Sequence, residues 1–229
     1  MSAVTRGLTV ATAAETYERF RPGYPDEIVD RALSYAGRPV RTALELGAAT
    51  GKATRAFASR GVRVTALEPD PVMFAVLERE TVGMPVQPLP RTLTTYDGPP
   101  ADLLYAAEHV PLRRWQRMAG LLVPGGVVAL FRSSVRALDA GLPVVEAWEP
   151  PLSEHLPAEL GDVQERLLSR HLLLPSRELV GYLSTTSAYL ELSAMRRQEE
   201  LRRIADELPT QVRVEAMVHL LLARRGGAR

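Results

Sequence analysis

A short turn bounded by two glycines, followed later by one glutamate, has the clearest chemical content in this sequence. The segment Glu45–Lys52 contains Gly47 and Gly51, and apolar residues precede it. A small-residue turn between a strand and a helix lets a ligand approach the backbone closely. Glu68 follows about twenty residues later, where an acid can accept hydrogen bonds from both hydroxyls of a ribose. Together these residues favour a ribose-containing ligand, although Glu68 alone would equally fit an acid in a surface turn.

The spacing within this turn argues against two common nucleotide sites. A dinucleotide-binding turn has the pattern G-x-G-x-x-G, which the glycines at 47 and 51 do not match. A phosphate-binding loop needs serine or threonine directly after its lysine, but Ala53 follows Lys52. This spacing disfavours an NAD-binding oxidoreductase. That class of enzyme is kept as an alternative, which binding tests with a panel of cofactors would decide.

The composition is that of an ordinary globular protein. Of 229 residues, 46% are hydrophobic and 24% are charged, and the formal net charge is +1. These values argue against disorder, and a nucleic-acid-binding protein would usually carry a larger or more clustered positive charge. The absence of cysteine excludes disulfides, cysteine-ligated zinc and a thiol nucleophile. Lysine is nearly absent and asparagine is absent, which indicates a bacterial gene rich in G and C.

Targeting segments are not recognisable in the sequence. No apolar run is long enough for a membrane-spanning helix, and the first residues lack the pattern of a signal peptide. We therefore expect a cytoplasmic protein that does not act at a membrane. The run at 196–203 mixes arginines with glutamates and is typical of a solvated helix face, so we expect no nucleic-acid partner either.

Apolar strands alternate with helices over the first 131 residues. Helices are expected at 11–21 and about 25–36, then strands at 42–46, 62–67, 86–89, 101–107 and 127–131, with helices at 52–60, 71–79 and 112–122 between them. This alternation predicts an α/β fold of the Rossmann-like class, with a mostly parallel twisted sheet and helices on both faces.

The alternation ends after Phe131. Residues 132–157 are rich in proline, and helices are expected at about 158–170, 176–191 and 194–208 before one or two strands at 212–223. An insertion after the fifth strand lies at the edge of the sheet where ligands bind, so we interpret 133–190 as a helical lid. A single domain would then comprise N-terminal helices (1–38), a binding core (39–132), this lid and a C-terminal part (191–229).

Three motifs in this order resemble class I S-adenosylmethionine-dependent methyltransferases. They are the glycine turn 45–51, the strand-ending Glu68-Pro69-Asp70, and the Leu121–Gly126 segment before the fifth strand. The segment Tyr17–Pro25 is similar to the opening of a bacterial small-molecule branch that includes trans-aconitate methyltransferase and UbiE-type enzymes. The resemblance covers nearly the whole chain and implies S-adenosyl-L-methionine as cofactor and S-adenosylhomocysteine as product.

The resemblance also implies which residues bind the cofactor. The backbone of the glycine turn would contact the methionine part, the acid at 45 would help to hold its amino group, and the acid at 68 would bind the ribose. The residue at 73 would pack on adenine, although it equally fits a helix core, and two N-terminal residues would close over the cofactor. The full set is Tyr17, Arg21, Glu45, Gly47, Ala49, Gly51, Glu68, Pro69, Met73, Thr92 and Ala107.

Two segments depart from the family pattern. The acid that often follows the third strand and binds the adenine amine is missing from Leu89–Leu93, where backbone groups or Thr92 would have to replace it. The histidine-containing segment after the fourth strand is shortened to Ala107–Pro111, and His109 would match that histidine. The acceptor end of the pocket is thus where this chain is least typical.

Methyl transfer is an in-line displacement at a sulfonium, and it depends mainly on orientation in a dry pocket. His109 is the candidate general base, with Glu108 orienting it or binding substrate; both also fit a loop position. Arg132 would bind an acceptor carboxylate or phosphate, or pair with a lid acid. Tyr24 and Trp148 complete the acceptor set, although Trp148 equally fits an anchor of the lid. No metal motif is present.

The sequence therefore predicts methyl transfer to a small-molecule acceptor by a monomer or homodimer. The inferred bacterial genome and the shortened acceptor segment favour a role in secondary metabolism. Three alternatives remain open. The same fold with the same cofactor could catalyse a cyclisation or rearrangement. The chain could be a non-catalytic binding or partner subunit, or the NAD-binding oxidoreductase named above.

Overall fold

The computed structural model of the chain describes residues 13–108, 114–139, 141–142 and 156–226. The chain divides into two compact units. The core unit comprises Gly23–Arg132, Pro150–Arg166 and His219–Arg229, and the helical unit comprises Met1–Pro22, Ser133–Glu149 and Leu167–Val218. His109 and Trp148, for which the sequence predicted functional roles, lie outside the described residues.

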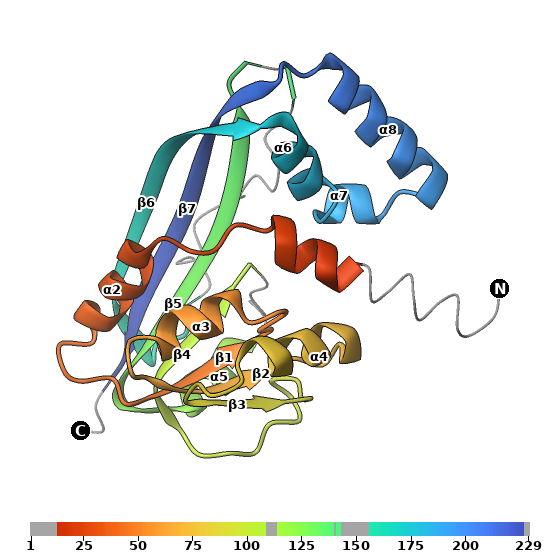
Figure 1. Cartoon of the computed structure of the whole chain (residues 1–229). Coiled ribbons are helices and arrows are strands. Elements are labelled where there is room, and N and C mark those ends of the chain that lie inside the picture. Colours follow the sequence, from red (N-terminus) through yellow and green to blue (C-terminus); the bar gives the residue numbers. More distant parts are fainter. Residues whose placement is uncertain (1–12, 109–113, 140, 143–155, 227–229) are drawn as a thin grey trace. The chain divides into compact units, whose positions relative to one another are not determined.

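Seven strands form one sheet in the order β3-β2-β1-β4-β5-β7-β6 (Figure 1). Among β1 to β5, every pair of neighbouring strands is parallel. The strands are β1 (Thr42–Leu46), β2 (Arg63–Leu67), β3 (Val86–Leu89), β4 (Ala101–Ala107), β5 (Leu122–Ala137), β6 (Leu160–Pro175) and β7 (Gln211–Arg225).

Strand β1 lies at the point where the strand order reverses. It pairs with β2 on one side and with β4 on the other, so that Leu46 is level with both Leu67 and Ala106. The carboxyl ends of the three strands therefore meet at one edge. In open α/β sheets, ligands bind at such an edge.

The helices of the core unit are α2 (Asp26–Tyr35), α3 (Lys52–Ala58), α4 (Pro71–Glu80) and α5 (Trp115–Gly120). Helix α3 follows β1 and packs on the sheet through Phe57, whose ring stacks on that of Tyr105 with centroids 4.2 Å apart. Helix α4 begins at Pro71, and the side chain of Asp70 caps it by accepting hydrogen bonds from Val72 N and Met73 N. Figure 1 shows α3 and α4 on the same face of the sheet.

The connection from β3 to β4 contains no helix in residues 90–100. Leu93 and Tyr96 are its buried side chains. A groove of about 400 Å³ lies between this segment and the first residues of β1, β2 and β3, with Thr65 and Gln87 among its lining residues. The sheet is therefore partly open to solvent here, which explains why β2 alternates polar and apolar residues.

Strand β7 lies between β5 and β6 and is antiparallel to both. Next to the end of β5, Leu138 N donates a hydrogen bond to Arg213 O of β7. Arg136, two residues before Leu138, forms an ion pair with Glu215, which is two residues after Arg213. In the same way Ser176 N donates to Thr210 O, while the Ser169 hydroxyl donates to Glu215. In both pairs of strands, residue numbers increase along one strand while they decrease along its neighbour. The two strands of each pair are therefore antiparallel.

The expected fold class is confirmed, two segments differ from the sequence predictions, and the terminal segment forms one of the one or two strands expected there. The helix expected at 158–170 is wrong, because these residues belong to β6. The fifth strand extends from 122 to 137, and the terminal segment forms a single strand from 211 to 225. Backbone pairing between segments more than thirty residues apart decides these three strands, and local periodicity does not report such pairing. The predicted lid thus contributes strands as well as helices.

Helices α6 (Ser176–Leu183), α7 (Ser187–Leu190) and α8 (Ala194–Glu207) belong to the helical unit. The single helix expected at 176–191 is interrupted where the hydroxyls of Ser184, Thr185 and Thr186 donate to carbonyl oxygens three residues earlier. Such side-chain bonds compete with the helical pattern. The core of this unit contains Val135, Leu179, Tyr182, Leu183, Ile204, Val212 and Val214.

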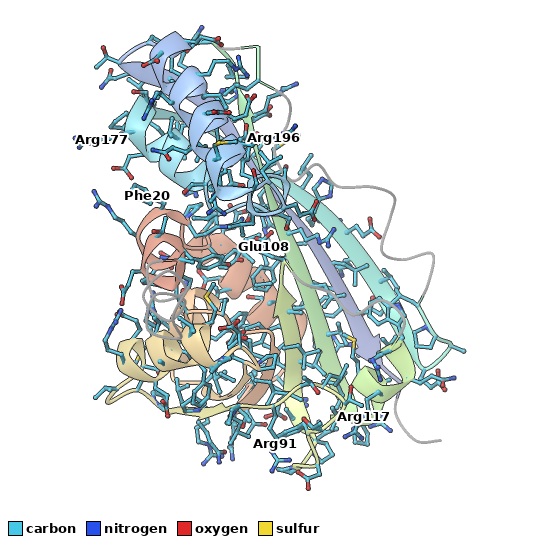
Figure 2. All side chains as sticks on the ribbon, turned by 90° about the vertical axis from the view of Figure 1, so that its right-hand side faces the viewer. Phe20, Arg91, Glu108, Arg117, Arg177 and Arg196 are labelled. Carbon is cyan, nitrogen blue, oxygen red and sulfur yellow. The ribbon has the colours of Figure 1, made fainter. Side chains whose placement is uncertain are left out.

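A helix at residues 13–20 packs against α6 in the same unit. A Cβ at Gly181 would lie 2.2 Å from the ring of Phe20, which Figure 2 labels. Arg21 follows this helix, and its guanidinium lies 5.3 Å from the ring centre of Tyr17 and 5.2 Å from that of Tyr182. These contacts fix the N-terminal segment within the helical unit.

Asp102 ties the first residues of β4 to the chain before β1. Its carboxylate accepts hydrogen bonds from Arg38 Nη1 at 2.7 Å, from Arg41 N at 3.0 Å, and from both N and Oγ1 of Thr42 at 3.0 Å. Partial burial alone would raise the pKa of this carboxyl, but these bonds outweigh burial and lower the pKa below its usual value.

We predict that Asp102→Asn lowers the free energy of unfolding at pH 7 by about 1–3 kcal/mol, because hydrogen bonds to a charged group are lost. Because the pKa of Asp102 is lower in the folded than in the unfolded state, its carboxylate stabilises the fold at pH values above the unfolded-state pKa of roughly 4. This contribution is lost as the pH falls through the folded-state pKa. The difference between variant and wild type should therefore shrink below pH ~4. Urea unfolding at several pH values, with the exposed Asp97→Asn as control, measures it; a pH-independent difference would contradict this account.

Candidate functional site

The glycine turn between β1 and α3 has a left-handed backbone at three positions. The φ angles are 68° at Gly47, 49° at Ala49 and 89° at Gly51. A Cβ at Gly51 would lie 2.8 Å from Leu77 Cδ1, so this glycine also allows α3 and α4 to approach each other. A Cβ at Gly47 would meet nothing within 4 Å. The backbone at Gly47 is therefore accessible to a ligand at the carboxyl end of β1.

Glu68 braces this turn from the end of β2. One carboxylate oxygen accepts a hydrogen bond from Ala49 N at 2.7 Å, and the other accepts from Asp70 N at 2.8 Å. Only 6% of the residue is exposed. The bond to Ala49 N helps to hold a non-glycine residue at positive φ, which costs conformational energy.

Glu45 lies inside the core beneath the turn. Its Oε2 accepts hydrogen bonds from Thr54 Oγ1 at 2.5 Å and from the Tyr105 hydroxyl at 2.9 Å. Complete burial raises the pKa of Glu45, and the hydrogen bonds from the two hydroxyls lower it. Burial is the larger effect, so the pKa is about 8. Glu45 therefore links β1, α3 and β4. The sequence analysis did not identify Thr54 and Tyr105 as partners of Glu45. Side chains alternate between the two faces of a sheet, and Tyr105, which pairs with Glu45, lies on the same face.

The residues expected near adenine lie around the start of α4 and after β3. Pro69 is exposed, and Met73 in the first turn of α4 is half-buried. Glu68 N donates to Leu89 O, which joins the ends of β2 and β3. Thr92 is exposed and closes a turn with Thr95 through its backbone N and its hydroxyl. The cofactor roles of these residues stay predictions.

Three residues that the sequence placed on the acceptor side lie in contact with each other after β4. The Tyr24 hydroxyl donates to Glu108 Oε1 at 2.9 Å, and Arg132 Nε donates to the main-chain oxygen of Glu108 at 2.8 Å. Glu108, labelled in Figure 2, directly follows Ala107, the last residue of β4, and has a φ of 68°. The fold therefore gathers residues separated by 84 and 24 positions of sequence.

The remaining candidates are placed as follows. Tyr17 and Arg21 contact each other and Tyr182 in the helical unit, where Arg21 Nη2 also donates to Thr185 O at 3.3 Å. Their expected role over the cofactor stays a prediction. Among the described residues no group of three metal-ligating side chains gathers, and no described helix is long and apolar enough to cross a membrane.

The arrangement of these elements is shared with solved methyltransferases. A protein of Anaeromyxobacter dehalogenans named as a type II methyltransferase superposes with a TM-score of 0.63 at 22% identity, over 91% of this chain and 100% of that chain. This chain has the methyltransferase fold. Phosphoethanolamine N-methyltransferase 2 of Haemonchus contortus, solved with S-adenosyl-L-methionine, also shares the fold (TM-score 0.56, 13% identity, 94% of this chain and 57% of that chain).

The methyltransferase fold also occurs in the cyclase SpnF, which superposes with a TM-score of 0.54 at 17% identity over 91% of this chain and 85% of that chain. In sequence, an uncharacterised methyltransferase of Mycobacterium tuberculosis is 37% identical over 130 residues, which are 54% of this chain and 51% of the relative. The chain thus spans about half the length of the curated relatives it matches. No family model matches the sequence.

The buried carboxyl of Glu45 predicts a pH dependence of stability. The folded protein holds this proton up to a pH of about 8, whereas the unfolded chain releases it near 4.5. Between these values the folded state binds more protons, so the free energy of unfolding falls as pH rises, by at most about 1.4 kcal/mol per pH unit. Glu45→Gln is neutral at every pH and should remove this part of the slope.

Urea unfolding of wild type and Glu45→Gln between pH 5 and 8 checks this prediction. The exposed Glu78→Gln serves as the matched control, since it removes a carboxylate from the surface of α4. If the two variants have the same slope as wild type, Glu45 is ionised in the folded core and the assignment is wrong.

Proposed function

We propose that this protein transfers a methyl group from S-adenosyl-L-methionine to a small-molecule acceptor. The observation that carries the proposal is the glycine turn at 47–51, which Glu68 braces at the edge where β1, β2 and β4 end. This edge is the general ligand site of open α/β sheets. The fold shared with methyltransferases supports the proposal.

The residues at this edge fit the cofactor part by part. The accessible backbone at Gly47 and Ala49 suits the methionine part, and the carboxylate of Glu68 directly after β2 has the position of an acid that accepts hydrogen bonds from ribose hydroxyls. Pro69 and Met73 present apolar surface for adenine, with Thr92 beyond β3. Glu45 is only 1% exposed and already binds two hydroxyls. We therefore assign Glu45 to holding the turn, and any contact with the cofactor amino group would pass through water.

The bound cofactor supplies an electrophilic methyl group on a sulfonium. The protein's own residues then have to orient the acceptor and exclude water, because such a displacement depends mainly on alignment. We assign this task to Glu108, which follows β4, together with Arg132 in β5, Tyr24 and Trp148. His109 is the proposed general base where the acceptor holds a proton, and Tyr17, Arg21 and Ala107 are proposed to contact the cofactor.

The finer parts of the proposal rest on the sequence. The resemblance of Tyr17–Pro25 supports the bacterial branch that acts on small molecules, and the atypical segment after β4 supports an acceptor of secondary metabolism. We further propose a cytoplasmic enzyme that works as a monomer or homodimer without nucleic-acid partners.

One alternative function has a specific observation behind it. The cyclase SpnF has the same fold, so the proposed cofactor site is compatible with a cyclisation or rearrangement. The mass of the product distinguishes the two, because methyl transfer adds one carbon and a rearrangement adds none.

We predict that purified protein binds S-adenosylhomocysteine in calorimetric titration and does not bind NADH. Glu68→Ala should raise the dissociation constant about 10- to 100-fold, because a charge-assisted hydrogen bond to the ribose and the brace on Ala49 are lost together. Gly47→Val should weaken binding similarly, since its side chain would occupy the space beside the turn and strain a positive φ.

Matched controls are Glu78→Ala, an exposed acid on α4, and Gly161→Val, a glycine in β6 at which an added Cβ would meet nothing within 4 Å. Thermal unfolding of each variant confirms that it is folded. If both site variants bind S-adenosylhomocysteine with wild-type affinity, the assignment of the cofactor to this turn is wrong. Binding of NADH instead would favour an oxidoreductase.

A further inference from the structure

Glu108 is the acidic side chain that the fold places beside the proposed methyl donor. We propose that its carboxylate binds a neutral amine, so that the acceptor atom is nitrogen. This inference rests on the proposed methyl transfer and adds the chemical class of the acceptor.

The register of the sheet places Glu108 next to the glycine turn. Leu46 of β1 is level with Ala106 of β4, so Gly47 and Ala107 are the next residues on the two strands. Glu108 therefore leaves β4 beside the residues at which the glycine turn leaves β1. Neighbouring strands lie about 4.8 Å apart, so the backbone of Glu108 starts within one strand spacing of the turn that would bind the methionine part of the cofactor.

The conformation of Glu108 is costly and is held by several contacts. A φ of 68° is unusual for a residue other than glycine and costs energy unless the surroundings fix it. Glu108 N donates to Phe131 O at 2.9 Å, and Arg132 Nε donates to Glu108 O at 2.8 Å. Backbone strain that the neighbouring strand maintains in this way is typical of residues that position a functional group.

The side chain of Glu108 is held from a third element and lies beside aromatic residues. The Tyr24 hydroxyl donates to Oε1 at 2.9 Å. The Tyr24 ring packs edge-to-face on the buried ring of Phe131, with centroids 4.7 Å apart. A carboxylate next to aromatic rings is a combination that favours cationic groups, and Glu108 is only partly exposed to solvent.

The charge balance of methyl transfer explains why this environment suits nitrogen. The lone pair of a neutral amine forms the new N–C bond while the C–S bond breaks and its electron pair stays on sulfur. The positive charge thus moves from sulfur to nitrogen, and the methylated ammonium afterwards loses a proton to solvent. A carboxylate at the nitrogen stabilises the charge that develops there. An anionic oxygen nucleophile would instead be repelled by Glu108 and would develop no positive charge.

Three probes of similar size test the inference: 2-phenylethylamine, 2-phenylethanol and phenylacetate. Their binding to protein loaded with S-adenosylhomocysteine is measured by saturation-transfer NMR, which does not depend on turnover. We expect wild type to prefer the amine. Glu108→Gln should weaken the amine about 10- to 100-fold, because a charge-assisted hydrogen bond is lost, and leave the alcohol unchanged.

Two further variants separate the charge from the fold. Tyr24→Phe removes the hydroxyl contact to Glu108 and keeps the carboxylate, so the preference for the amine should persist. Glu80→Gln removes a distant acid and should behave as wild type. Absence of amine binding, or a preference that Glu108→Gln leaves intact, overturns the inference.

Failure of the inference is distinguishable from failure of the proposed function. If S-adenosylhomocysteine does not bind to the wild-type protein, the proposed methyl transfer itself is refuted. Cofactor binding followed by methylation of the alcohol or the carboxylate would keep methyl transfer and refute the amine. Incubation with S-adenosyl-L-methionine and 2-phenylethylamine is expected to give the N-methylated product, identified by its mass and fragmentation.

Discussion

The parallel pairing of β1 between β2 and β4 is the constraint on which the candidate site depends. Because all three strands run in one direction and end level with one another, the segments that follow them start at one edge. The glycine turn follows β1, Glu68 follows β2, and Glu108 follows β4. No one of these segments determines the site alone, since each needs its neighbour's backbone at about one strand spacing.

Carboxyl groups at this edge have different environments and therefore suit different tasks. Glu45 is completely buried, where desolvation raises its pKa and leaves a neutral hydrogen-bonding group that joins β1, α3 and β4. Glu68 accepts hydrogen bonds from two backbone amides at the end of β2. Glu108 binds a tyrosine hydroxyl on the acceptor side. Burial and partners, more than residue type, separate a structural carboxyl from one that can meet a ligand.

Local patterns in the sequence are sufficient for the first part of the chain. Strands β1, β3 and β4 have the predicted bounds, and α4 begins at the predicted Pro71 because proline and the Asp70 cap act locally. The acceptor segment was less accessible to this reasoning. Tyr24, Glu108 and Arg132 were each candidates, but their contacts join three separate elements, and no local pattern shows which of them meet.

The sequence by itself determined the βαβ alternation, the glycine turn and the acid after the second strand, because turns, caps and strand lengths depend on neighbouring residues. Only the tertiary structure decided that residues 160–175 form β6, since their backbone pairs with a strand that begins more than thirty residues later. It also decided that Glu45 is enclosed by Thr54 and Tyr105 and that Glu108 adopts a left-handed backbone. These features depend on contacts between distant elements, and such contacts override local propensity.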